Sequence, residues 1–124
     1  MDDAGTPLGE VRARLRAFNA AREWGRYHSP RNLAMALSVE AGELLELYLW
    51  SEDGRLPVAE RKGRLADEAA DVLISLLNLC EAEGLDLTAA TEAKLRKNAE
   101  KYPESLARGR LEKYDELPRP PDDT

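Results

Sequence analysis

Carboxylates inside the apolar faces of two predicted helices, between Glu40 and Asp71, constrain this chain more than any other feature. At about 100° per residue, an apolar stripe follows the helix expected over residues 30–50, and Glu40 lies within that stripe. The apolar members are Leu33, Leu37, Leu44, Leu47 and Tyr48. Glu68 lies at the border of the apolar face of the next helix. An isolated buried carboxylate costs several kcal/mol unless it is paired, protonated or bound to a metal, so the sequence predicts a cation here.

Further carboxylates accompany these two. Glu43 lies about 60° from Glu40 at the edge of the stripe, and Glu46 lies about another 60° on, towards solvent. Asp71 follows Glu68 by three residues. A Glu-x-x-Glu pair alone is usually a solvated face, but two pairs on adjacent helices would form an all-oxygen site. Such a site suits Mg²⁺, with Mn²⁺ as a substitute, rather than zinc or copper.

Iron is a poor fit to the same carboxylates. Di-iron bundle proteins use Glu-x-x-His pairs, and the one histidine, His28, has no carboxylate three residues before it. Nucleophilic catalysis also finds no support, because Cys80 falls on an apolar helix face, where it is expected to be a buried spectator.

Helical periodicity covers most of the chain, and no stretch reads as a strand. Ser29 before Pro30 and Asp86 before Leu87 are helix starts, and Gly84 is a helix stop. The expected helices span residues 8–25, 30–50, 57–83 and 87–102. Four helices with short links predict an all-α, oligomeric four-helix bundle.

The expected organisation is one domain with two tails. Residues 1–7 are small, acidic and turn-prone, and indicate a flexible N-terminal tail. Residues 8–102 form the helical domain, and the prolines of residues 103–124 indicate an irregular C-terminal tail.

The overall charge and composition exclude several classes of protein. The net charge of −6 argues against binding a nucleic-acid polymer, because proteins that bind such polymers present basic surfaces. No apolar run is long enough to span a membrane, and the acidic start at Asp2 and Asp3 is unlike a basic signal region. With a single cysteine, a reducing compartment is the default, and a cytoplasmic protein is expected.

Two groups of side chains are candidates for contacting a substrate. One helix face carries Lys94, Asn98 and Lys101. This face would either contact a triphosphate or be exposed to solvent. Aromatic residues lie at the two ends of the carboxylate helix. They would either stack on a base or only pack against other side chains of the protein. The residues of this second group are Trp24, Tyr27, His28 and Trp50.

The carboxylate motifs resemble a known family. The segments Glu40–Glu46 and Asp67–Leu73 are similar to the ExxE and ExxD motifs of the MazG-like, all-α nucleoside triphosphate pyrophosphohydrolases, and within them to the dCTP pyrophosphatase group. The similarity covers residues 12–118. It includes Trp24, Trp50 and Lys94.

This resemblance implies a metal-dependent enzyme that hydrolyses a nucleoside triphosphate to its monophosphate and pyrophosphate. The implied Mg²⁺ ligands are Glu40, Glu43, Glu68 and Asp71. Lys94 and Asn98 would hold phosphate or sugar, and the segment 24–28 with Trp50 would line the base pocket. Some members of the group carry a tyrosine where this chain has Ser75, so this difference bears on the choice of base.

The expected mechanism and assembly follow. A carboxylate not fully engaged by metal would take a proton from water, and Glu43 or Glu46 is the candidate. The family resemblance implies a homotetramer, and the segment Val72–Cys80, apolar almost all round, independently suggests burial on several sides. The leading hypothesis is hydrolysis of dCTP or a modified pyrimidine dNTP in nucleotide pool cleansing. The alternatives are the same chemistry on dUTP, purine or broad substrates, and a non-catalytic helical interaction module.

Overall fold

The computed structural model describes residues 1–49 and 58–118, and its regular elements are all helices. Within those residues there is no strand, so the all-α prediction is confirmed. The helices are α1 (Leu8–Ala21), the 3₁₀ helix η1 (Trp24–Tyr27), α2 (Pro30–Leu49), α3 (Val58–Glu83), α4 (Leu87–Lys101) and α5 (Glu104–Ala107). The chain divides into two compact units, Met1–Leu85 and Asp86–Thr124.

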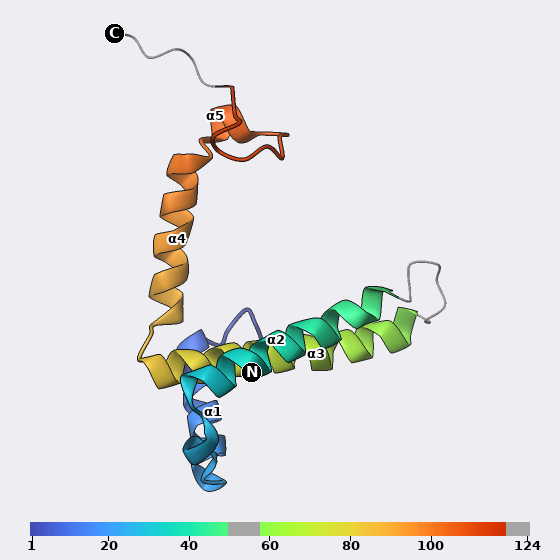
Figure 1. Ribbon diagram of the computed structural model, residues 1–124, viewed down its shortest axis with the longest axis vertical. Coiled ribbons are helices and arrows are strands. Elements are labelled where there is room, and N and C mark those ends of the chain that lie inside the picture. The colour runs from blue at the N-terminus through green and yellow to red at the C-terminus, as the bar shows by residue number, and fades with distance from the viewer. Residues whose placement is uncertain (50–57, 119–124) are drawn as a thin grey trace. The chain divides into compact units, whose positions relative to one another are not determined.

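The first unit is built on α2 and α3, which lie side by side and antiparallel (Figure 1). Its buried apolar side chains come from both helices: Leu33 and Leu47 from α2, Leu77 and Cys80 from α3. Leu77 is 1% exposed, and Cys80 is buried, as the sequence predicted. This packing brings the carboxylate-bearing parts of the two helices together.

The helix starts predicted at Ser29 and Asp86 and the helix stop predicted at Gly84 are confirmed. The Ser29 hydroxyl oxygen accepts from the Asn32 backbone N–H at 3.2 Å, and the Asp86 carboxylate accepts from the Ala89 N–H at 2.9 Å. Gly84, with φ of 65°, follows α3 in the left-handed conformation that glycine adopts without strain. Trp50 and the expected helix start at Pro57 lie outside the described residues.

The first helix ends earlier than residue 25. Glu23 has φ of 53°, so the backbone leaves the α-helical region before Trp24 and continues as η1. The N–H groups of Arg22 and Glu23 donate to the carbonyls of Asn19 and Ala20, which closes the last turn of α1.

The second unit contains α4, α5 and the segment that follows them. Tyr114 packs edge-on against Tyr102, with ring centroids 6.3 Å apart, and the Lys101 ammonium lies 5.0 Å from the Tyr114 ring centre. Leu117 is 5% exposed. In the described part of the chain, no helix is long and apolar enough to cross a membrane.

Two arginines of α1 hold the C-terminal end of α3. The Arg16 guanidinium donates to both carboxylate oxygens of Glu81, from Nε at 2.6 Å and from Nη2 at 3.1 Å. Arg12 donates to Glu81 from Nη2 at 3.1 Å and to the Leu85 carbonyl from Nη1 at 2.6 Å. The bonds from Arg16 and then Arg12 lower the pKa of Glu81 to about 2. This ion-pair cluster fixes α1 against α3.

Glu81→Gln is expected to lower the free energy of unfolding at pH 7 by only about 0.5–1 kcal/mol, because the side chain is 42% exposed and solvent screens its ion pairs. The lowered pKa of Glu81 means that this stabilisation is complete above the ordinary value of 4.5 and is lost as pH falls towards 2. Urea unfolding of both proteins between pH 7 and pH 2 measures this. The exposed Glu83→Gln on the same helix is the matched control. A Glu81 effect that stays constant down to pH 2 would contradict the assignment.

Candidate functional site

Three carboxylates from α2 and α3 converge where the two helices pack together. Glu40 of α2 and Glu68 and Asp71 of α3 each offer one carboxylate oxygen, and these oxygens lie within 4.8 Å of one another. Glu68 and Asp71 share a helix face because they are three residues apart. We call these three residues the acidic cluster.

Two oxygens of the acidic cluster are enclosed and unpaired. Glu40 Oε2 and Glu68 Oε2 are buried, and neither has a hydrogen-bond partner among the described residues. Asp71 is exposed, so the cluster opens to solvent on its side. Buried polar atoms are nearly always satisfied in folded proteins, and a divalent cation with oxygen ligands satisfies both at once. The donor set therefore fits Mg²⁺ or Mn²⁺.

The electrostatics of the cluster favour a cation for the same reason. Desolvation raises the pKa of Glu40, and the negative charges of Glu43, Asp71 and Glu68 raise it further. The pKa of Glu68 is also raised, first by desolvation and then by the neighbouring carboxylates of Glu43 and Asp71, while Arg64 opposes the shift. Without a cation, the desolvation cost and the mutual repulsion of these carboxylates can be relieved only by protonation.

The structure places the predicted carboxylates as the helix faces suggested. Glu40 and Glu68 are the half-buried members, whereas Glu43, Glu46 and Asp71 are exposed. Glu43 is near enough to Glu40 and Glu68 to act on the pKa of both. The roles of all five as ligands or bases stay predictions.

The residues predicted to contact the base lie in different surroundings. The Trp24 ring packs edge-on against Phe18, with centroids 5.6 Å apart, and remains 44% exposed. Tyr27 is exposed, His28 is half-buried and Ser75 is 9% exposed. Trp50 lies outside the described residues.

The predicted phosphate-contacting residues belong to the second unit. Lys94, Asn98 and Lys101 follow one face of α4. The Asn98 carbonyl accepts from the Tyr102 N–H at 2.8 Å, which ends that helix, and Lys101 contacts the ring of Tyr114.

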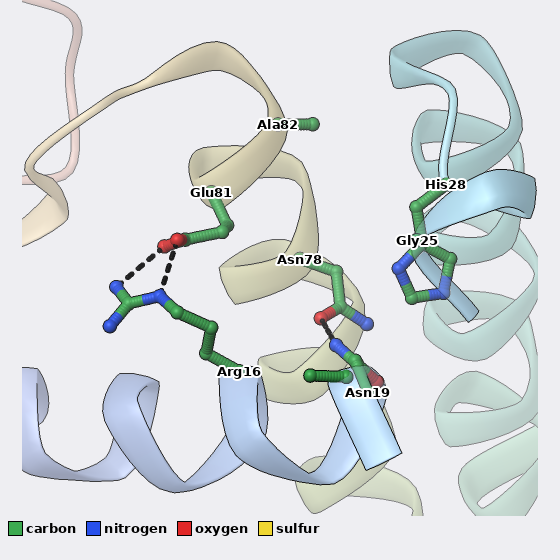
Figure 2. A pocket seen from close by; sticks show the side chains of 8 residues that line it. Arg16, Asn19, Gly25, His28, Asn78, Glu81 and Ala82 are labelled. Atoms are coloured by element: carbon green, nitrogen blue, oxygen red, sulfur yellow. Dashed lines mark hydrogen bonds and ion pairs between the residues drawn. The ribbon is translucent and has the colours of Figure 1, made fainter. Parts of the chain in front are cut away.

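A cavity of about 290 Å³ lies between α1, η1 and the C-terminal part of α3 (Figure 2). Its lining residues are Arg16, Asn19, Ala20, Gly25, His28, Asn78, Glu81 and Ala82. Asn19 Nδ2 donates to Asn78 Oδ1 at 2.8 Å across this cavity. Of these residues, only His28 was a predicted site residue. The available signal was Asn78, which together with Ser75 interrupts the apolar run of residues 72–80.

Comparisons with known proteins agree with this architecture. The model of the MazG-like family matches residues 35–117. The chain is 40% identical to dCTP pyrophosphatase 1 of Rattus norvegicus over 116 residues, which is 90% of this chain and 68% of that protein. The corresponding proteins of Homo sapiens and Bos taurus are 40% and 38% identical, with the same coverage.

A solved structure of a pyrophosphatase is also similar to this chain. The crystal structure of a pyrophosphatase from Archaeoglobus fulgidus has a TM-score of 0.70 and 40% sequence identity, covering 83% of this chain and 98% of that one. Both the resemblance noted from the sequence and the prediction that the chain is an enzyme are confirmed. The chain belongs to the MazG-like family.

Proposed function

We propose that this protein is a Mg²⁺-dependent pyrophosphohydrolase that cleaves dCTP, or a modified pyrimidine dNTP, to the monophosphate and pyrophosphate. The observation that carries the proposal is the pair of enclosed, unpartnered oxygens of Glu40 and Glu68 beside Asp71. The names of the curated relatives supply the substrate, since each is a dCTP pyrophosphatase. Mn²⁺ would substitute for Mg²⁺ because both prefer oxygen ligands.

The acidic cluster would hold the cation, with Glu43 completing the ligand set from its exposed edge. The bound cation would neutralise phosphate charge and lower the pKa of a water molecule. Glu43, whose carboxylate acts on both Glu40 and Glu68, accepts the proton of the attacking water, and Glu46 orients the neighbouring groups. The water oxygen bonds to one of the two phosphorus atoms as the P–O bond from that atom to the bridging oxygen breaks, which releases the monophosphate and pyrophosphate.

The remaining contacts come from residues on other helices. Lys94, Asn98 and Lys101 on α4 bind phosphate or sugar, with the lysines offsetting negative charge as pyrophosphate leaves. Trp24, Tyr27 and His28 would contact the base, and the contact predicted for Trp50 lies outside the described residues. Ser75 contributes little direct contact in a single chain, because it is nearly buried.

Exposed apolar side chains on α2 and α3 support assembly into a homotetramer. In the single chain Met35 and Val39 of α2 are each 58% exposed, and Leu73 and Ile74 of α3 are about 40% exposed. Such surfaces mark protein interfaces when they are contiguous. The cellular role that fits a dNTP substrate is cleansing of the nucleotide pool in the cytoplasm.

The test is a panel of nucleoside triphosphates incubated with Mg²⁺, Mn²⁺ or EDTA, with separate assays for pyrophosphate and orthophosphate. Pyrophosphate should form in 1:1 ratio with dCMP, and chelation should stop the reaction. Formation of orthophosphate would reject cleavage between the α- and β-phosphates. No product from any triphosphate with either metal would reject the proposed function, and a preference for dUTP or purines would reject the substrate alone.

A further inference from the structure

The hydrogen bond between Asn19 and Asn78 carries an inference about how the substrate contacts are positioned (Figure 2). We infer that this bond is a latch that holds η1 in place for the substrate, and that Asn78 is a positioning residue on α3. The inference rests on the proposed function, in which side chains of η1 and His28 contact the base. The two amides act through η1 and do not themselves touch the nucleotide.

The latch is the last of a series of contacts between α1 and α3. Arg12, Arg16 and Asn19 follow one another at steps of four and three residues, which places them on one face of α1. The two arginines bond to Glu81, and Asn19 Nδ2 donates to Asn78 Oδ1 at 2.8 Å. Asn19 is the member of this series nearest to η1, and both amides are half-buried. The latch therefore fixes the end of α1 from which the chain enters η1.

The helix η1 has little of its own to hold it in position. It is a single turn of 3₁₀ helix, a conformation with poor hydrogen-bond geometry, and none of its side chains is buried. Glu23, just before it, has φ of 53°, a left-handed conformation that a non-glycine residue keeps only where the surrounding structure holds it. The Trp24 ring contacts Phe18, but Phe18 belongs to α1, so this contact moves with α1. The position of η1 therefore depends on how its two flanking segments are anchored.

Both flanking segments are anchored to the helices that carry the acidic cluster. After η1, Asn32 Nδ2 of α2 donates to the Tyr27 carbonyl at 3.3 Å. Before η1, the latch ties α1 to Asn78 of α3. Asn78 follows Asp71 by seven residues, which corresponds to about two turns and about 10 Å along one helix. One continuous helix thus sets the spacing between the acidic cluster and η1.

The test is a kinetic comparison of Asn19→Ala, Asn78→Ala and the double variant. Each should raise KM for dCTP by about three- to tenfold, because one net hydrogen bond shifts an equilibrium by roughly that factor. The value of kcat should change by less than about twofold, since the latch aids binding and not the chemical step. The double variant should match the single variants instead of multiplying their effects, because all three lack the same bond.

Two kinetic results would overturn the latch. One is an unchanged KM in both single variants, and the other is a double variant whose effect is the product of the two single effects. Continued release of pyrophosphate from dCTP in either case would leave the proposed function standing.

Glu81→Gln is the matched control, because it weakens the contact between α1 and α3 about one helical turn beyond the latch. It should lower stability and leave KM for dCTP unchanged. If Glu81→Gln raised KM as much as Asn78→Ala does, general loosening of α1 would explain the effect, and a specific latch would be rejected.

A second measurement needs no substrate. Trp24 is the first residue of η1, and Trp50→Phe removes the other tryptophan of the chain, so the fluorescence of Trp24 can be followed alone. In that background, without metal or nucleotide, Asn78→Ala should increase the quenching of Trp24 by acrylamide and lower its fluorescence anisotropy, which reports motion of the ring. Glu81→Gln should change neither. Equal quenching and anisotropy with and without Asn78→Ala would overturn the latch, whether or not the protein cleaves a triphosphate.

Discussion

Glu40→Gln is expected to lower kcat/KM for dCTP by at least about a hundredfold while leaving helix content unchanged. The amide keeps the size of the side chain but removes a negative ligand from a site where one Glu40 oxygen already lacks a partner. Steady-state kinetics with saturating Mg²⁺ measures the loss, and circular dichroism measures the fold. Glu60→Gln, the same change at an exposed position in the first turn of α3, is the control.

The same substitution should not destabilise the metal-free protein. Burial and neighbouring carboxylates raise the pKa of Glu40, so its charged form opposes folding and the metal-free wild type should gain stability as pH falls from 7. Glu40→Gln should be as stable as the wild type at pH 7 or more so, and should gain less on acidification. Addition of Mn²⁺ should also raise the melting temperature of the variant less than that of the wild type. A wild-type-sized Mn²⁺ shift in the variant would mean that Glu40 is not a ligand.

Leu77→Ala is expected to lower the free energy of unfolding by about 3 kcal/mol, because it leaves a cavity around the most buried side chain of the α2–α3 packing. Urea unfolding at one fixed protein concentration measures this loss. Activity per folded molecule should be retained, since Leu77 lies on neither the acidic cluster nor the cavity.

Leu73→Ala is the matched comparison on the same helix, because Leu73 is 38% exposed in the single chain. It should cost less than about 1 kcal/mol of chain stability. If the exposed face is the tetramer interface, light scattering should instead show a lower assembled mass. An unfolding cost for Leu73→Ala equal to that for Leu77→Ala, with no change in mass, would contradict the core assignment.

The helices and the acidic cluster were predictable from local information. Ser29, Asp86 and Gly84 mark helix ends through bonds within a few residues, so sequence spacing is enough to locate them. Glu40 could be identified because a carboxylate in an apolar stripe has a large free-energy cost wherever the helix packs. Its convergence with Glu68 needed only two adjacent antiparallel helices.

Features that depend on long-range packing were not predictable. The run Val72–Cys80 is apolar on nearly all sides, so periodicity does not show that Leu77 faces the core while Leu73 remains exposed. The cavity requires α1 to lie against α3, with Asn19 meeting a residue 59 positions away. The end of α1 depends on Glu23 in a left-handed conformation that few sequence signals announce.

The enclosed oxygens of Glu40 and Glu68 have a consequence for how long the protein survives in a cell. These residues are 28 positions apart in the chain and converge only when it is folded, so a cation bound there favours the folded state alone. Above the dissociation constant, each tenfold rise in free cation adds about 1.4 kcal/mol to stability. Proteases act on the unfolded fraction, so with the proposed cation bound, the supply of divalent metal would slow degradation of this chain as well as support turnover.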